Sequence, residues 1–304
     1  MDEILSKQHY RRTFFGFVLL ILLLALSARF FVLPYFDPEL LLTITSLFGS
    51  LLDNLVVSLF LAVFIGAFVF WLTPSIVKRS VIEVVAPKQI NSLLKTAANG
   101  TRSWIYKGAC GRYTRATTIP KLAEAARIEG IGRDITICIL NPKNDELCTA
   151  YATYRRSLKS GKSGTAWTCQ VVQEEILATA ITALKFQFSE PQLRIRLFFV
   201  DHFSAFRLDI SDLYVVVTKE DKEASALRAD VGTYFYDSYK DEVRLTERQS
   251  KEMMCCGKLE FADVLDEAKL REAINCANIF DEANLANLNV ARLLACINSP
   301  NDPY

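Results

Sequence analysis

The sequence predicts a membrane protein in two parts: an N-terminal hairpin of two membrane-spanning helices, and a cytoplasmic α/β domain that ends in further helices. Two long apolar segments lie near the N-terminus, a strand–helix–strand pattern follows them, and the C-terminal residues show helical spacing of leucine and alanine. These observations divide the chain into a hairpin (1–80), an α/β domain with a mixed sheet (81–238) and a helical segment (239–304). We expect that segment to pack on the domain or on another copy.

The two predicted spans are residues 14–33 and 54–77. The first contains a single charge, Arg29, and the second contains none. A hydrocarbon core ~30 Å thick needs about 20 apolar residues in a helix, so both segments are long enough to cross it. Buried helices of a soluble core are the alternative, but such helices normally have a polar face, which these segments lack. A cleaved signal peptide fits poorly because a second apolar segment follows closely.

Basic residues flank the spans on one side only. The connection 34–53 contains no lysine or arginine, whereas basic residues lie before the first span and after the second: Lys7, Arg11, Arg12, Lys78, Arg79 and Lys88. Because lysine and arginine are retained on the cytoplasmic side, both termini are predicted to be cytoplasmic. Arg29 lies near the outer end of its span, where we expect it to reach the lipid headgroups.

Composition narrows the function classes. The formal net charge of +1 gives no overall field that would attract a nucleic acid polymer. The eight cysteines include no CxxC pair, and the chain has only two histidines, so no zinc site is indicated. In a reducing compartment these cysteines are expected to be free thiols. We therefore expect no metal or cofactor, and no nucleic acid polymer among the partners.

The α/β domain is predicted from its alternating elements. A helix is expected from Pro87 to about Gly100, with proline in its first turn and glycine at its end. The order strand, loop, helix and strand that follows predicts a βαβ unit with a parallel pair of strands. Its parts are a strand at 103–106, a loop at 108–118, a helix at 119–129 and a strand at 134–140.

The remaining elements continue this pattern. Helices are predicted at 144–158, 166–188, 239–254, 262–279 and 282–297, and strands at 193–200, 213–218 and 231–236. Short connections between the later strands allow antiparallel pairing, so we expect parallel and antiparallel strands in one sheet.

The loop 108–118 is the first candidate ligand site. It contains Arg112, Tyr113, Arg115 and Thr117 between the end of a strand and the start of a helix. In an open α/β sheet, ligands bind beyond the carboxyl ends of the strands and near helix N-termini, which suit anions. Arginine adds bidentate contacts to phosphate. The alternative is an ordinary solvated loop, which we weigh equally.

Two further segments contribute candidates. The connection 201–212 contains His202, Arg207 and Ser211, and His202 is the only histidine outside the N-terminal tail. Histidine-dependent chemistry in the domain would have to use it, although a loop histidine without a catalytic role is the favoured alternative. Tyr154 and Arg155 are expected to add a basic, aromatic wall to the same pocket, unless they lie on a solvated helix face.

Residues 103–142 and 193–218 resemble half of a phospholipase D-like (HKD) domain, in which a strand similar to ITICILNP belongs to a βαβ unit. In the HxKxxxxD motif, Asp212 matches the aspartate, but Ala205 stands at the histidine nucleophile and Arg207 at the lysine. The resemblance therefore implies the fold without the phosphohistidine intermediate. It predicts a non-enzymatic, phosphate-binding domain in which Arg207 retains a phosphate contact.

The layout of two spans and a cytoplasmic ligand-binding domain is similar to the two-transmembrane effectors of bacterial antiphage systems that respond to cyclic oligonucleotides. This resemblance implies a bacterial inner-membrane protein, a cyclic di- or oligonucleotide ligand, a homo-oligomer, and disruption of the lipid bilayer as the output. Two alternatives stay open. One is a membrane-bound phosphodiesterase or phospholipase that uses His202, and the other is a structural membrane protein whose C-terminal helices recruit a partner.

Overall fold

The computed structural model of the protein has two compact units, residues 1–79 and 80–304. The residues described are 8–36, 43–72, 80–159, 166–221, 223–255, 257 and 259–302. The basic residues Lys7, Lys78 and Arg79, and the end of the second predicted span, lie outside them.

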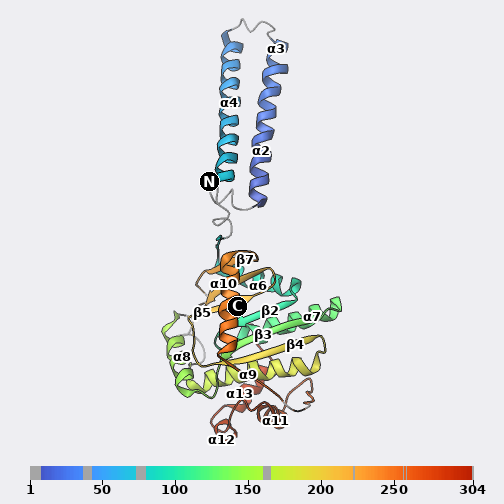
Figure 1. Ribbon diagram of the computed structural model, residues 1–304, viewed down its shortest axis with the longest axis vertical. Helices are drawn as coiled ribbons and strands as arrows, with labels where there is room; N and C mark the ends of the chain where they lie inside the picture. The colour runs from blue at the N-terminus through green and yellow to red at the C-terminus, as the bar shows by residue number, and fades with distance from the viewer. Residues whose placement is uncertain are drawn as a thin grey trace. The chain divides into compact units, whose positions relative to one another are not determined.

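The N-terminal unit contains two long apolar helices (Figure 1). The first is α2 (Gln8–Ser27), which continues through the π-helical turn η1 (Ala28–Val32) into α3 (Leu33–Phe36); the second is α4 (Thr43–Leu72). Both are long and apolar enough to cross a membrane, over Gly16–Tyr35 and Ser46–Phe68. The second helix begins at Thr43 and not near residue 54 as predicted, because Leu47, Phe48 and Leu51 extend its apolar character towards the N-terminus.

These two helices are not core helices of the described fold. Only 11% of the first apolar stretch is buried within the protein, and 0% of the second. Arg29 also has a partner on the facing helix, which we did not predict. Its Nε donates a hydrogen bond to Asp53 Oδ1 on the facing helix at 2.8 Å. Gly49 leaves room for the guanidinium, whose carbon lies 3.7 Å from the position a Cβ would take there.

The second unit is built on an eight-stranded mixed sheet with the order β1-β7-β6-β5-β2-β3-β4-β8. The strands are β1 (Glu83–Val85), β2 (Ser103–Lys107), β3 (Arg133–Leu140), β4 (Leu193–Val200), β5 (Phe206–Ile210), β6 (Tyr214–Lys219), β7 (Ala226–Asp230) and β8 (Lys251–Glu252). Strands β2, β3 and β4 run parallel, as the βαβ pattern predicts, and the other pairs are antiparallel. The expected mixed sheet is therefore confirmed.

Helices cover both faces of the sheet (Figure 1). One face packs against α10 (Tyr234–Arg248), whose Tyr236 and Val243 join a core with Phe198 and Val215. The other face packs against α9 (Cys169–Ser189), which is buried on nearly every side from Val172 to Leu184. A helix that is apolar all round belongs between two layers. The layer outside α9 is formed by the C-terminal helices α11 (Glu267–Ala277), α12 (Glu282–Leu285) and α13 (Val290–Asn298).

Three shorter helices complete the unit: α6 (Pro87–Gly100), α7 (Ile119–Glu129) and α8 (Asp145–Ser157). The predictions for α6, α7 and β4 are confirmed to the residue or nearly so. A proline in the first turn begins α6, and the Asn144 side chain accepts a hydrogen bond from Leu147 N to begin α8. Pro120 lies in the first turn of α7, where it continues a helical backbone that starts at Arg112. Caps and prolines are local signals, which is why the sequence places these helices well.

Several other predictions are wrong. A strand was expected at 231–236, but the strand in this region, β7, ends at Asp230. Gly232 then turns the chain with φ +83°, and Thr233 caps α10. The connection 201–212 contains the strand β5. The helix expected at 282–297 is divided into α12 and α13, because the Asn289 side chain accepts from Arg292 N and starts a new helix.

Candidate functional site

A small pocket lies at the ends of three central strands of the sheet, where three chain segments meet. Pairing of Lys107 with Leu208, and of Phe206 with Lys219, brings the carboxyl end of β2, the start of β5 and the end of β6 together. The cavity has a volume of about 50 Å³. This is room for a few water molecules or one small anion. Its aromatic walls are Tyr106, Tyr113, Tyr151 and Trp167, and its charged lining is Arg112, Arg155, Arg207, Lys219, Glu220 and Asp221.

The loop after β2 reaches the pocket through a tight turn at Gly111. This glycine has φ +67°, and a Cβ there would lie 2.8 Å from Thr179 Cγ2 on α9. Thr179 Oγ1 donates to Cys110 O at 2.6 Å, which fastens the turn to the helix below. Arg115 N donates to Gly111 O, so a helix begins here and the expected loop 108–118 is helical from Arg112 onwards. Gly111, Arg112 and Tyr113, where this helix begins, line the pocket.

Three arginines with described ion pairs line the pocket, and Arg112 is the most exposed of them. Its side chain is 38% exposed, and its Nε lies 3.6 Å from Glu175 Oε2, which is too long for a hydrogen bond. The guanidinium carbon lies 5.8 Å from the centroid of the Trp167 ring. Arg112 is thus held loosely, with its polar atoms available at the pocket.

Arg155 lies on the other side of Trp167. Its guanidinium carbon is 4.9 Å from the ring centroid, and its Nη1 donates to the Glu220 carbonyl, with the Glu220 carboxylate 3.7 Å away. Its buried Nε has no hydrogen-bond partner within the described part of the chain. A buried donor of this kind is costly unless water or a ligand accepts from it.

Arg207 and Asp209 lie on the same face of β5, in contact with Tyr106 on β2. Arg207 Nε donates to Asp209 Oδ2 at 3.1 Å. Burial raises the pKa of Asp209 to about 6, although the neighbouring guanidinium of Arg207 opposes the shift. Asp209 Oδ1 is a buried acceptor without a partner among the residues described. Burial likewise raises the pKa of Tyr106, so its hydroxyl stays protonated.

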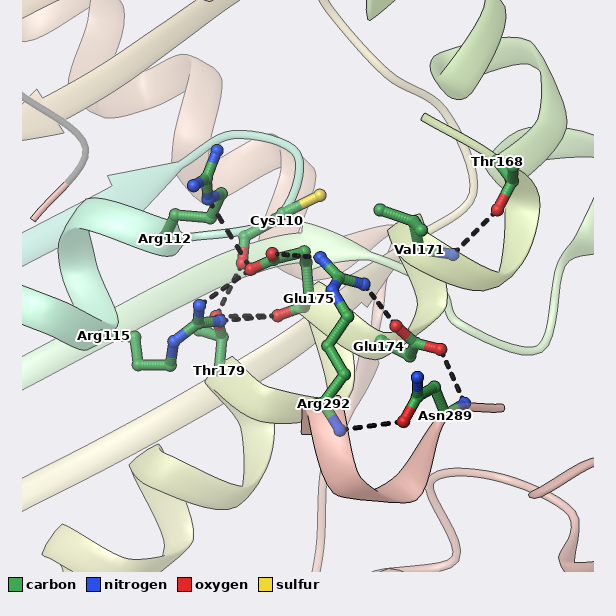
Figure 2. A network of polar contacts seen from close by, with 10 residues as sticks. All are labelled: Cys110, Arg112, Arg115, Thr168, Val171, Glu174, Glu175, Thr179, Asn289 and Arg292. Carbon is green, nitrogen blue, oxygen red and sulfur yellow. Dashed lines mark hydrogen bonds and ion pairs between the residues drawn. The ribbon is translucent and has the colours of Figure 1, made fainter. Parts of the chain in front are cut away.

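Beneath the pocket, a closed network of ion pairs connects α9 to the C-terminal helices (Figure 2). Glu175 Oε2 accepts from Arg115 Nη2 at 2.7 Å, and Glu175 Oε1 accepts from Arg292 Nη2 at 2.8 Å. Arg115 Nη1 also donates to Thr179 Oγ1 at 3.1 Å. Burial alone would raise the pKa of Glu175, but Arg115 and Arg112 outweigh it, so the pKa is lowered.

The structure brings four of the nine predicted site residues together in the pocket: Arg112, Tyr113, Arg155 and Arg207. The other five do not line it. Arg115 is buried in the network below, Thr117 is buried in the π-helical turn η2 (Thr114–Thr118), and Tyr154 packs against Tyr151 and Phe203. His202 is exposed, and the buried Ser211 hydroxyl donates to Tyr214 O within a turn.

The three positions matched to the HxKxxxxD motif do not converge. Arg207 lies at the pocket, whereas Asp212 lies beyond the other end of β5. Asp212 Oδ2 accepts from the backbone amides of Arg102 and Ser103 at 2.7 and 3.0 Å, so it fixes the start of β2. Its position in the fold is explained by this backbone role.

Among the pocket residues that sequence reasoning missed are Trp167, Lys219, Glu220 and Asp221. The last three follow the predicted strand 213–218 directly and begin a charged run. Their position at a strand end was the available signal, because the partner strand β5 begins where β6 ends. Trp167 has no such signal, since only folding brings it between Arg112 and Arg155.

Comparisons with known proteins do not assign the chain to a family. No protein-family model matches it, and no curated protein matches it. Among solved structures, a similar chain is "Structure of TrmBL2, an archaeal chromatin protein, shows a novel mode of DNA binding". It is 12% identical, covers 68% of this chain and 67% of that chain, and has a TM-score of 0.33. At that TM-score the likeness carries no argument about function.

One partner prediction is corrected here. We expected no nucleic acid polymer among the partners, whereas the solved structure named above is described as showing DNA binding by that protein. The exclusion rested on the net charge of +1, which describes the whole chain and not a local cluster of arginines. We withdraw the exclusion. The match does not bear on a lipid or small-molecule partner.

Proposed function

We propose that the domain of residues 80–304 binds the phosphate group of a small phosphate-bearing molecule in this pocket. In this proposal the two apolar helices anchor the domain at the cytoplasmic face of a bacterial inner membrane, where it acts as an effector or sensor. The observation that carries the proposal is Arg112, a half-exposed guanidinium at the pocket whose described ion pair is long, 3.6 Å, and shared with two better-placed arginines.

The charge of the pocket supports an anion. Four basic side chains line it against two acidic ones, an excess of two positive charges. Guanidinium groups match the geometry of phosphate oxygens and form two parallel hydrogen bonds with them. The first amides of the helix that begins at Arg112 add donors and a partial positive charge at the same place.

The size of the cavity limits what enters it. A volume of about 50 Å³ suits a phosphate group and not a nucleobase. The aromatic residues are buried as walls, and Trp167 already contacts Arg112 and Arg155. We therefore expect a ligand such as a cyclic nucleotide to place a phosphate in the pocket and its bases outside.

Binding is tested on the full chain in detergent, first with inorganic phosphate and then with nucleoside monophosphates and cyclic di- and oligonucleotides. Arg112→Ala should weaken binding by ~2 kcal/mol, or about 30-fold, because a charge-assisted contact is lost. Arg112→Lys should not restore full affinity, because an ammonium presents one point of charge.

The matched control is Arg127→Ala. Arg127 lies on the same stretch of helix and also forms a 3.6 Å ion pair with a glutamate, Glu190, but it is outside the pocket lining. The Arg127→Ala variant should bind phosphate like the wild type. Equal affinities of the wild type and Arg112→Ala for every probe would show that the pocket is misplaced.

The membrane part of the proposal is supported by two long helices whose apolar side chains are exposed to the surroundings. An 18-residue apolar stretch left in water would be an aggregation hazard, whereas lipid is its natural solvent. Resistance to extraction by alkaline carbonate tests insertion, and protease accessibility in inverted vesicles tests whether both termini are cytoplasmic. Complete release by carbonate would exclude membrane spanning.

The effector part is tested in cells. If ligand activates the apolar helices, Arg112→Ala should abolish membrane damage; if ligand restrains them, the variant should be toxic where the wild type is tolerated. Uptake of propidium by cells expressing either form distinguishes the two signs. Identical uptake with Arg112→Ala, Arg207→Ala and wild type would separate the pocket from any membrane output.

A further inference from the structure

One carboxylate is shared between the pocket and the C-terminal helix α13 (Figure 2). Glu175 Oε2 faces Arg115 at 2.7 Å and Arg112 at 3.6 Å, while its Oε1 faces Arg292 of α13 at 2.8 Å. Glu175 is therefore a buried anion that already competes for the arginine we assign to the ligand. How strongly it competes depends on the other cations around it.

We propose that Glu175 competes with the bound anion for Arg112, and that Arg292 sets the strength of this competition. Arg292 is then a positioning residue of the anion site, and docking of α13 regulates the affinity of the pocket. This inference rests on the proposed function and adds its regulation.

The charges of the network support the competition. Three arginines, Arg112, Arg115 and Arg292, face two glutamates, Glu174 and Glu175. Arg115 and Arg292 occupy the short contacts, at 2.7 and 2.8 Å, so Arg112 is the partner of Glu175 at the longest distance, 3.6 Å. Without the charge of Arg292, Glu175 Oε1 loses its partner and the carboxylate attracts Arg112 more strongly. Arg112 is then less available to a ligand.

Arg292 also couples the docking of α13 to the charge around Glu175. Its Nη1 pairs with Glu174, whose Oε1 accepts from Asn289 N at 2.8 Å. Leu293 and Ile297 of the same helix are buried. Displacement of α13 would therefore remove Arg292 from both glutamates at once. By linkage, an anion that draws Arg112 away from Glu175 should strengthen the pair with Arg292 and tighten α13.

The test uses the full chain in detergent and inorganic phosphate. Arg292→Gln, which removes the charge, should weaken phosphate binding by about fivefold, a typical coupling between sites. Arg292→Lys retains the charge and should bind within about twofold of the wild type. Arg271→Gln is the control, since Arg271 lies on α11 and its described ion pair is with the exposed Glu267 of the same helix. A packing effect alone would reduce binding by Gln and Lys alike and would overturn the proposal.

Amide hydrogen exchange of residues 290–298 gives a second readout. Phosphate should slow it in the wild type, and Arg112→Ala should slow it without any ligand, because Glu175 is then left to Arg115 and Arg292. If the wild type does not bind phosphate, both the proposed function and this inference fail. If the wild type binds and Arg112→Ala does not, but Arg292→Gln matches the wild type and exchange is unchanged, only the regulation is overturned.

Discussion

Arg112 and Arg115 lie one helical turn apart and face the same carboxylate, yet they belong to different regions of the molecule. Arg115 is in the closed network, with a side chain 4% exposed and short bonds to Glu175 and Thr179. Arg112 is in the pocket, with a side chain 38% exposed and a contact of 3.6 Å. A buried arginine held by short ion pairs contributes to the fold, whereas a loosely paired one at a cavity is available to bind.

Removal of the carboxylate that Arg112 and Arg115 share should affect the two arginines very differently. Glu175→Ala should destabilise the domain by ~3–5 kcal/mol, because it leaves the buried Arg115 charge without its partner. Arg112→Ala should change stability by less than about 1 kcal/mol, as expected for a half-exposed, long ion pair. Thermal unfolding followed by circular dichroism measures both. Equal stabilities for the two variants would remove the distinction between the regions.

The turn that joins the two regions can be tested with a pair of glycines. Gly111 and Gly130 both have φ +67°, but only at Gly111 would a Cβ meet another atom, Thr179 Cγ2 at 2.8 Å. Gly130→Ala should cost about 1 kcal/mol for the left-handed backbone. Gly111→Ala should cost roughly 3 kcal/mol, since the clash with α9 adds to the same strain, and it should also reduce phosphate binding. Similar costs at both glycines would show that the turn tolerates a shift.

A change of pH tests the effect of the Asp209 charge on the pocket. The folded-state pKa of Asp209, about 6, is raised above its ordinary value of 3.8. The stability from this group is therefore fully present below about pH 4 and is lost as pH rises through about 6. Protonation of Asp209 also removes a negative charge beside Arg207. Glu220 is the other carboxylate whose charge affects the pKa of Asp209.

Binding of sulfate, which stays doubly charged over this range, should therefore strengthen roughly fivefold between pH 7 and pH 5. Asp209→Asn should bind at pH 7 as the wild type does at pH 5. His202→Gln is the control and should retain the pH dependence, because His202 is exposed and outside the pocket lining. Titration calorimetry at both pH values measures the change. Loss of the dependence in His202→Gln would assign it to the histidine.

The smallest effect is expected at His202 itself. His202→Ala should leave stability within about 0.5 kcal/mol of the wild type, as for most surface substitutions. Phosphate binding should also be unchanged. An enzyme that used this histidine would instead lose all hydrolysis of a phosphodiester such as bis(p-nitrophenyl) phosphate, so any hydrolysis that disappears in His202→Ala would favour the enzymatic alternative.

The sequence alone determined the features that depend on local pattern. The two apolar helices follow from length and composition, β4 follows from a run of apolar residues, and α6 and α7 follow from the prolines in their first turns. It also indicated Arg112, Tyr113, Arg155 and Arg207, because basic and aromatic residues beyond strand ends are typical of anion sites. Each of these signals is contained within a few consecutive residues.

Which arginines are buried in short ion pairs depends on tertiary contacts. Arg115 finds Glu175 sixty residues away, on a helix whose apolar composition gives no sign of a buried carboxylate. The strands β5 and β7 likewise lie in polar stretches, where pairing with β6 stabilises an extended backbone that their own residues do not demand. Whether a charge is paired or available depends on distance and burial, and these are properties of the folded chain that no local pattern contains.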